Sequence, residues 1–333
     1  MDKGSFPTRF LGTLQKPAVS LILRLVVSGL LLAYLLRLSA LTDIALAFSR
    51  IDPFYLSAFF VLYFSGVSLQ ALRWKYLLRA WEIDQGYFAL LRWILTGLFL
   101  NNFLPGSLGG DAYRLYSGGR DTGKVETIAA TIFYERILSY GSLVTLGLIV
   151  LSIRADLTRD WSFWLLLGGA MTGLLVLSTL STFPVFERWA SALAERSTFI
   201  RKLRPQDWIN SFRFKVRHPA MLAGVFLVSF VIQLADVYSF RLVAAAIRLP
   251  VKFSDLLLFV PLLYLAILLP ISFNGIGIRE SVFVIFSSSW GISSADAVAF
   301  SLTVFALNLA GSLIGGVIYW FDRPRRGIGM TDP

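Results

Sequence analysis

Residues 104–114 read Leu-Pro-Gly-Ser-Leu-Gly-Gly-Asp-Ala-Tyr-Arg, and residues 269–279 read Leu-Pro-Ile-Ser-Phe-Asn-Gly-Ile-Gly-Ile-Arg. Both stretches follow the pattern L-P-x-S-x-x-G-x-x-x-R without a gap. Each belongs to an apolar segment, 87–104 in the first case and 255–269 in the second, that ends at the Leu-Pro pair. The repetition predicts two related halves, each with a helix interrupted at that pair.

The chemistry of the repeated stretch explains why a helix should break there. Pro105 and Pro270 disfavour helical geometry in the residue before them and end the incoming helix. Ser107 and Ser272 can cap the N-terminus of an outgoing helix. The glycines permit positive φ and let another backbone or a ligand approach closely.

The composition indicates that these breaks lie inside a membrane. The 333 residues are 56% hydrophobic and 15% charged, with a mean hydropathy of +0.69, whereas a soluble domain carries roughly a quarter charged residues. We therefore expect a single transmembrane domain over residues 1–333. The net charge of +11 does not predict a nucleic-acid partner, because Lys and Arg collect in short loops as membrane insertion requires. The chain has no cysteine, which excludes disulfides and thiolate chemistry.

Six apolar segments are long enough to cross a bilayer, which takes about 20 helical residues. They are 19–38, 53–72, 126–152, 161–181, 220–240 and 296–320. The basic N-terminus precedes a full-length apolar run, so we interpret the first segment as a retained helix.

Loop charges decide whether the interrupted segments 87–104 and 255–269 also cross. If 87–104 crossed, the strongly basic segment 183–219 would lie outside, against the positive-inside bias. If each interrupted segment enters the membrane and returns on the same side, 183–219 and both termini are cytoplasmic. The aromatic and basic residues of 183–219 then suit amphipathic helices on an anionic bilayer surface.

The expected fold is therefore an all-α, polytopic integral membrane protein. It has six transmembrane helices and two re-entrant helical hairpins, arranged as inverted repeats over about 53–153 and 220–321. Non-helical backbone at membrane depth is tolerated only when it is buried in protein or lines a wet cavity. The two breaks consequently predict an internal polar cavity, where free N–H groups at helix N-termini form an anion site.

Charged residues near the breaks supply the candidate binding groups. An arginine inside a membrane costs at least ~2.5 kcal/mol on insertion scales, so Arg114 and Arg279 need a partner or a purpose. Asp111 lies three residues before Arg114, close enough to pair on one helix face. Glu280 points elsewhere than its neighbour Arg279, and a contact across the cavity with Arg114 is one expectation. These four residues either contact substrate or form only a salt-bridge latch between the halves.

Further candidates are polar groups at or near the breaks and within the spans. Asn102 either binds substrate or satisfies carbonyls at the end of the first half-helix. Glu135 and Asp236 either carry a coupling proton or pair with Arg136 and Arg241. The remaining expected substrate-binding residues are Ser107, Ser272, Asn274, Gly110 and Gly275. The sequence contains no catalytic triad, metal-ligand spacing or cofactor motif, so no catalytic residue, metal or cofactor is expected.

The two motifs resemble a known family, the flippase-like transmembrane domain of bacterial lysylphosphatidylglycerol synthases and their stand-alone relatives. The similarity rests on Asn101-Asn102-Phe103-Leu104-Pro105-Gly106-Ser107-x-Gly109-Gly110-Asp111-x-x-Arg114 and on Leu269-Pro270-x-Ser272-x-Asn274-Gly275-x-Gly277-x-Arg279-Glu280. The resemblance implies movement of lipids between leaflets. It does not imply synthase activity, which in that family belongs to a separate soluble domain.

Together, these observations predict a lipid transporter or flippase in the bacterial inner membrane. Its substrate would be a phospholipid or a polyprenyl-linked lipid with an anionic, phosphate-bearing headgroup. The alternatives are a membrane enzyme or accessory subunit acting on lipid-linked sugars, and a small-solute secondary transporter. The lipid, the direction, the energy source and the oligomeric state are not determined by the sequence.

Overall fold

The structure is a computed structural model that describes residues 52–102, 108–153, 165, 167–173, 219–268 and 275–321. The predicted span 19–38, most of 161–181 and all of the basic segment 183–219 except Pro219 lie outside the described residues. So do Ser107, Ser272 and Asn274.

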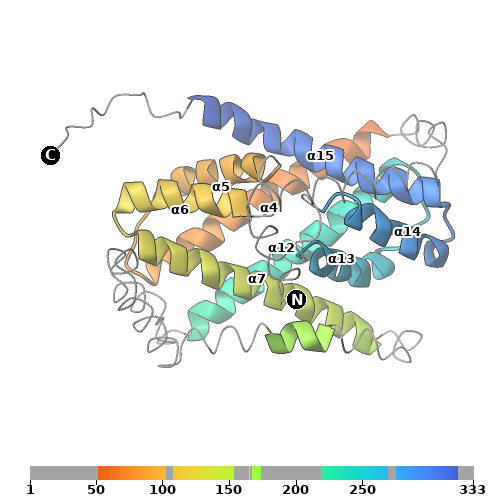
Figure 1. Ribbon diagram of the computed structural model, residues 1–333, viewed down its shortest axis with the longest axis horizontal. Helices are drawn as coiled ribbons and strands as arrows, with labels where there is room; N and C mark the ends of the chain where they lie inside the picture. Colours follow the sequence, from red (N-terminus) through yellow and green to blue (C-terminus); the bar gives the residue numbers. More distant parts are fainter. Residues whose placement is uncertain are drawn as a thin grey trace, which may run out of the picture.

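Besides the helical residues 167–173, the described chain forms two runs of four helices and contains no strand (Figure 1). Each run has the order long, short, short, long. The first run is α4 (Pro53–Arg79), α5 (Tyr87–Asn101), α6 (Leu108–Thr122) and α7 (Val125–Ile153). The second is α12 (Pro219–Ala246), α13 (Phe253–Leu268), α14 (Ile278–Trp290) and α15 (Ser294–Phe321).

Length and composition make the four long helices candidate membrane spans. They have 27 to 29 residues, or roughly 40 Å at 1.5 Å per residue, which exceeds the ~30 Å hydrocarbon core. They coincide with four of the six predicted spans. The short apolar helices α5 and α13 have 15 and 16 residues, or about 22–24 Å.

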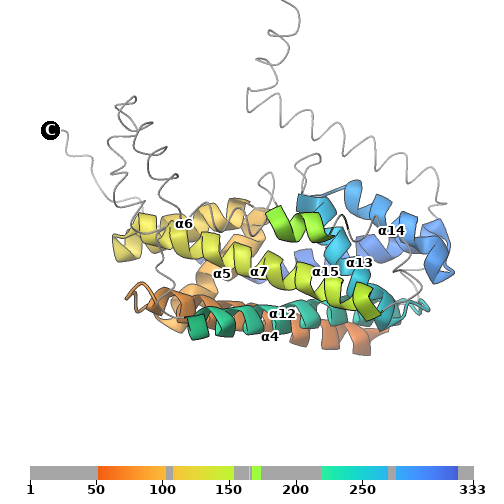
Figure 2. The ribbon, with the colours of Figure 1, turned by 90° about the horizontal axis from the view of Figure 1, so that it is seen from below.

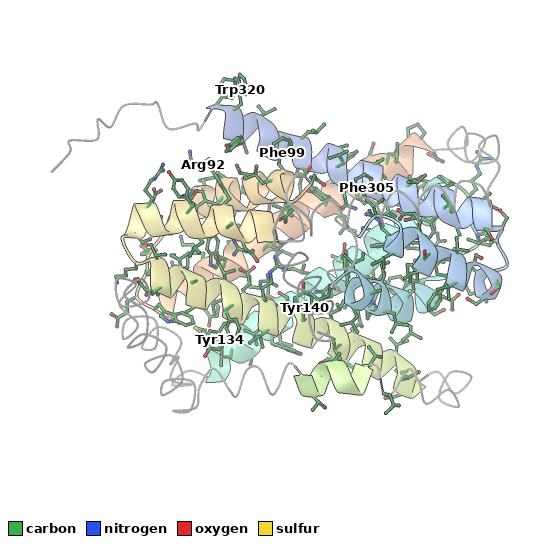
Figure 3. The ribbon with its side chains drawn as sticks, viewed as in Figure 1. Arg92, Phe99, Tyr134, Tyr140, Phe305 and Trp320 are labelled. Atoms are coloured by element: carbon green, nitrogen blue, oxygen red, sulfur yellow. The ribbon has the colours of Figure 1, made fainter. Side chains whose placement is uncertain are left out.

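The outer surface of the bundle is apolar, as expected of a protein surrounded by lipid. Large hydrophobic side chains on the long helices are strongly exposed, including Phe54, Val61, Leu227, Val317 and Trp320. Figure 3 shows Trp320 near the end of α15, away from the centre of the bundle where Tyr140 lies. A multi-pass membrane protein is the class that these helices define.

The span predicted to end at residue 72 is longer in the structure. Helix α4 continues to Arg79, because its apolar face continues through the buried Trp74, Leu77 and Leu78. Arg73 is therefore a buried residue within a helix, whereas the predicted span 53–72 placed it in the loop that follows.

Helices α4 and α12 pack against each other in opposite directions. The Asp52 N–H, at the start of α4, donates to the Ala246 carbonyl at the end of α12 over 3.0 Å. At the other end, Leu77 of α4 packs with Met221 and Val225 of α12. Figure 2 shows the two helices side by side along one face of the bundle.

Each short pair packs together and against a long helix of the other run. Helix α5 contacts α6 and α15, whereas α13 contacts α14 and α7. Contacts of α5 require glycine, because a Cβ atom on Gly110 of α6 would lie 2.7 Å from the Gly97 carbonyl oxygen. A Cβ atom on Gly315 of α15 would overlap the carbonyl of Leu95.

The turns after α4 and α12 have the same backbone geometry. Glu82 in the first turn has φ 56°, and Arg248 in the second has φ 58°. They are the two non-glycine residues with positive φ among the described residues. The Ile83 N–H donates to the Leu78 carbonyl, and the Leu249 N–H donates to the Ala244 carbonyl. Glu82 corresponds to Arg248, Ile83 to Leu249 and Leu78 to Ala244. The two members of each pair are separated by the same number of residues along the chain.

Candidate functional site: a buried arginine–carboxylate cavity

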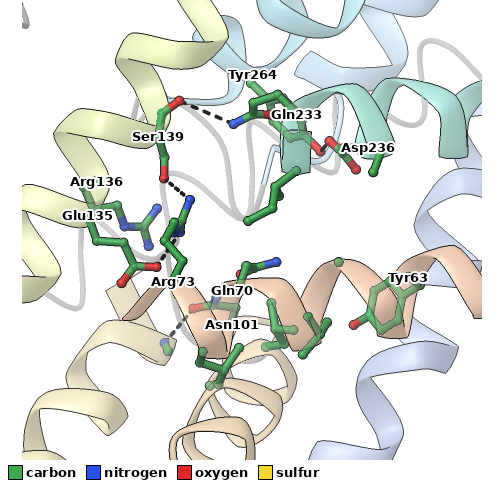
Figure 4. Close-up of a pocket in the computed structure, with 18 of the residues that line it drawn as sticks. Tyr63, Gln70, Arg73, Asn101, Glu135, Arg136, Ser139, Gln233, Asp236 and Tyr264 are labelled. Atoms are coloured by element: carbon green, nitrogen blue, oxygen red, sulfur yellow. Dashed lines mark hydrogen bonds and ion pairs between the residues drawn. The ribbon is translucent and has the colours of Figure 1, made fainter. Parts of the chain in front are cut away.

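A cavity of about 360 Å³ lies between the two runs of helices. Residues of α4, α5, α6, α7, α12, α13 and α15 line it (Figure 4). Its charged lining residues are Arg73, Asp111, Arg114, Glu135, Arg136 and Asp236.

Glu135 of α7 is the centre of the charge network. One carboxylate oxygen accepts from Arg73 Nη2 of α4 over 2.5 Å, and the other accepts from Arg114 Nη2 of α6. Glu135 is 5% exposed and Arg73 6%. Arg73 Nη1 also donates to the hydroxyls of Ser139 and Ser229, at 2.9 and 2.8 Å. This carboxylate therefore fixes three elements to one another.

Asp111 of α6 has two arginine partners. It lies 3.4 Å from Arg114 on its own helix, the i,i+3 pair that the sequence predicts, and 2.6 Å from Arg136 of α7. Arg136 Nη1 also donates to the Tyr140 hydroxyl over 3.3 Å. The ion pairs of Glu135 with Arg73 and Arg114, and of Arg136 with Asp111, therefore extend in different directions from α7, because neighbours on a helix point about 100° apart.

Arg114 is also held by an aromatic ring. Its guanidinium carbon lies 3.9 Å from the centroid of Trp74, a favourable cation–π geometry. The Trp74 indole N–H donates to the Thr131 hydroxyl over 3.2 Å and is thereby fixed. Arg114 Nε is buried without a hydrogen-bond partner.

Arg73 is the functional residue that the sequence interpretation missed. Buried residues recur at Val67, Ala71, Trp74 and Leu78, spacings of four, three and four that are typical of one helix face. That pattern could have extended the helix and placed Arg73 inside it.

The asparagines at the end of α5 fix the first break. Asn101 Oδ1 accepts from the Gly110 N–H over 2.6 Å, and so ties α5 to the start of α6. Asn102 Nδ2 lies 3.0 and 3.2 Å from the carbonyls of Leu98 and Phe99, and 2.9 Å from the Ser312 hydroxyl. Asn102 thus satisfies helix-end carbonyls, one of the two roles expected for it.

The described residues that follow the second break, from Gly275 to Glu280, do not line the cavity. Gly275 and Gly277 have φ 74° and 86°, and the Gly277 N–H donates to the Glu280 carboxylate over 2.6 Å. Glu280 also accepts from Ser301 at 3.1 Å. The expected contact between Glu280 and Arg114 is therefore replaced by local partners, because Glu280 caps its own helix.

Arg279 follows the second break and is largely buried. Its guanidinium lies 4.6 Å from the centroid of Phe305, and its Nε lies 3.4 Å from Glu280. Its Nε and Nη2 atoms have no hydrogen-bond partner. Arg279 and Glu280 are not among the residues that line the cavity.

Asp236 of α12 also lines the cavity, but its surroundings differ from those of Glu135 and Asp111, which each contact two arginines. The Tyr264 hydroxyl of α13 donates to its Oδ2 over 2.5 Å. Gln233, one turn earlier, donates to the Ser139 carbonyl over 3.4 Å (Figure 4). No ion pair joins Asp236 to a lysine or arginine within the described part of the chain.

Comparison with known proteins agrees with this class of multi-pass membrane protein. The profile of the family described as "Lysylphosphatidylglycerol synthase TM region" matches residues 21–316, and the chain belongs to this family. A UPF0104 membrane protein of Pyrococcus horikoshii is 23% identical over 299 residues, covering 82% of this chain and 89% of that protein. A UPF0104 membrane protein of Methanothermobacter thermautotrophicus is 25% identical over 302 residues, covering 82% of this chain and 85% of that protein. No solved structure matches the chain.

Proposed function

We propose that this protein is a lipid transporter that moves a phosphate-bearing lipid between the leaflets of a bacterial inner membrane. The observation that carries the proposal is the arginine-rich cavity enclosed by long apolar helices. Three arginines converge there with two paired carboxylates. Charged residues inside a membrane are costly, and they mark substrate paths when they line a cavity.

Matched geometry in the two runs of helices supports an inverted-repeat architecture. Exchange of α4 to α7 with α12 to α15 leaves the α4–α12 contact unchanged and converts each of the other principal contacts between the described helices into another one. For example, α5–α15 becomes α13–α7, and α6–α7 becomes α14–α15. Buried aromatic pairs follow the same offset as the matched turns, Trp74–Trp93 in one half and Phe240–Phe259 in the other. The antiparallel course of α4 and α12 supports opposite orientations in the membrane.

The short helices support the two re-entrant hairpins. At about 22–24 Å, α5 and α13 are too short to cross a ~30 Å core without strong tilt. Each packs against the helix that follows it, α6 and α14 respectively (Figure 1). With these hairpins and six spans, both termini are cytoplasmic and segment 183–219 lies on the anionic inner surface.

The cavity has a size suited to a headgroup. Small-molecule sites are typically about 300–1,000 Å³, and this cavity has about 360 Å³. In the proposed mechanism Arg114 and the N-terminus of α6 hold the phosphate, while Asp111 and Glu135 keep the arginines in place or contact a cationic headgroup. The hydrocarbon tails stay in the bilayer while the two halves rock about the site.

Arg279 enters the proposal as the counterpart of Arg114 in the second half. Its Nη2 atom, which has no hydrogen-bond partner, is available to an anion if the second break opens to the cavity in the other state of the transport cycle. Glu280, which caps α14, then orients Arg279 and does not itself hold the lipid.

The test uses vesicles of phosphatidylethanolamine and phosphatidylglycerol that contain the purified chain. Trace fluorescent phosphatidylglycerol or polyprenyl phosphate serves as the probe, with a glucosyl diacylglycerol as the phosphate-free comparison. Movement is measured by chemical quenching of the outer leaflet. The wild type is expected to move a phosphate-bearing probe, and Arg114→Ala to move it at least about tenfold more slowly, because a charge-assisted hydrogen bond contributes about 1.5–3 kcal/mol.

Arg120→Ala is the matched control, because Arg120 lies on the same helix, is half exposed and pairs with Asp121 on the surface. It should keep wild-type movement. Equal movement in the wild type and in Arg114→Ala, or movement no faster than in protein-free vesicles, would refute the proposal. Chemically altered probe lipids would indicate an enzyme, and uptake of water-soluble phosphate without lipid movement would indicate a solute transporter.

A further inference from the structure

Corresponding positions of the two halves face the same cavity with different chemistry. The first half contributes Gln70, Arg73 and Leu98, whereas the second contributes Asp236, Ser239 and Tyr264. Each residue of the second set follows its counterpart in the first at the offset that separates the matched turns. The cation of Arg73 in the first half therefore corresponds to the hydroxyl of Ser239 in the second. The amide of Gln70 in the first half corresponds to the carboxyl group of Asp236 in the second.

The carboxyl group of Asp236 lacks the partners that the other acids in the cavity have. Glu135 and Asp111 each contact two arginines. The Asp236 carboxyl group has no arginine or lysine partner among the described residues, and its polar neighbours are the hydroxyls of Tyr264 and Ser239. The Ser239 hydroxyl donates a hydrogen bond to the backbone carbonyl of Asp236 over 2.6 Å.

An ionised carboxylate in such surroundings is unfavourable. Asp236 is half-buried in the cavity, and a carboxyl group that is partly withdrawn from water without a paired charge can avoid the cost of ionisation by taking up a proton. A metal cation is a poor alternative, because hard cations need several oxygen ligands, and the described part of the chain has no cluster of three Asp, Glu, His or Cys residues that could hold one.

We propose that Asp236 binds a proton that is carried together with the lipid, which couples transport to a transmembrane proton gradient. This inference rests on the proposed function. An anionic headgroup and an ionised Asp236 would repel each other inside one small cavity. Protonation of Asp236 therefore favours entry of the headgroup, and loss of the proton on the other side favours its release.

Other ionisable side chains share this cavity from the helices packed against α12. They are Tyr63 and Arg73 of α4, Glu135, Arg136 and Tyr140 of α7, and Tyr264 of α13. The lining residue from α15 is the uncharged Asn308. Glu135 is the other acid among these groups, and its two arginine partners favour its ionised form. Asp236 has no such partner and is therefore the acid that can exchange a proton.

The first test detects the proton without transport. Infrared spectra of the purified full chain at neutral pH should contain the C=O stretch of a protonated carboxylic acid. Asp236→Asn should lose that band. Asp121→Asn should retain it, since Asp121 is a surface residue that pairs with Arg120. A band that is absent from the wild type, or unchanged in Asp236→Asn, would overturn the assignment.

The second test measures coupling with the phosphate-bearing fluorescent probe that the wild type moves. An imposed pH gradient should drive the probe to accumulate in one leaflet in the wild type and in Asp121→Asn. Asp236→Asn should equilibrate the probe but lose the accumulation. Accumulation in Asp236→Asn, or accumulation driven by a sodium gradient in place of the pH gradient, contradicts the inference. A wild type that moves neither fluorescent phosphatidylglycerol nor fluorescent polyprenyl phosphate contradicts the proposed function instead. In that case the infrared result still decides whether Asp236 holds a proton.

Discussion

At the scale of single residues, the charge network has built-in redundancy. Each carboxylate has two arginine partners, and Arg114 is the partner that Glu135 and Asp111 share. Loss of Arg114 therefore leaves Arg73 beside Glu135 and Arg136 beside Asp111. Loss of Glu135 leaves Arg73 without a carboxylate within the described residues. The two kinds of loss should have different consequences for stability.

We expect Glu135→Ala to destabilise the fold more than Arg114→Ala. Breaking a buried ion pair costs about 3–5 kcal/mol, because a charge is left uncompensated. The comparison is the thermal unfolding midpoint of each variant in the same detergent. Equal midpoints for the two variants would contradict the redundancy that the contacts imply.

The residues of the site were predictable to different degrees. The Asp111–Arg114 pair follows from spacing alone, because i,i+3 residues share a helix face. The contacts of Glu135 could not be predicted, since its partners lie 62 and 21 residues away and their meeting depends on how three helices pack. The predicted span ended at residue 72, one residue before Arg73, because a charge that follows a long apolar run usually marks the end of a span.

At the scale of helices, the position of α5 depends on direct backbone contact. Gly110 and Gly315 belong to the two helices that flank α5, and neither leaves room for a Cβ atom. The sequence motif predicted that a backbone would approach closely at the first break, and Gly97 is the residue that does so. The partner was not predictable, because nothing in the local pattern indicates which helix packs there.

Gly110→Ala should destabilise the protein and displace α5 from α6. Overpacking in a tight contact costs about 1–3 kcal/mol, and here the added Cβ would lie 2.7 Å from a backbone oxygen that cannot rotate away. Gly66→Ala is the control, because its Cβ would meet nothing within 4 Å. That variant should be neutral or slightly stabilised, as alanine favours a helix interior. Thermal unfolding of the two variants decides the point, and a Gly110→Ala midpoint at or above that of Gly66→Ala would count against it.

At the scale of the whole molecule, the repeated motif anticipated the order of the helices. The offset from Leu104 to Leu269 differs by a single position from the offset that separates the matched turns and aromatic pairs. The first residues of the four long helices also follow the starts of the predicted apolar segments closely, whereas α4 and α12 extend beyond their predicted ends. Contacts between distant helices, such as α4 with α12, were not predictable, because a loop-charge argument orients helices but does not choose their neighbours.

The proposed topology can be tested by labelling single cysteines, since the natural chain has none. Cysteine at Asp84, between α4 and α5, and at Lys124, between α6 and α7, should react only from the cytoplasmic side. Cysteine at Ser293, between α14 and α15, should react only from the outside. If α5 alone crossed the membrane and α6 did not return through it, Asp84 and Lys124 would react from opposite sides.

The contact between α4 and α12 has a particular consequence for motion. It is the one principal contact between the described helices that exchange of the two halves leaves unchanged. On the proposed inverted-repeat relation, these helices lie on the axis that interchanges the halves. They can then serve as the pivot of the conformational change, keeping their mutual packing while the surrounding helices tilt. The opposite-facing state would be reached when each half adopts the present conformation of the other. The structure of one state therefore predicts the structure of the second.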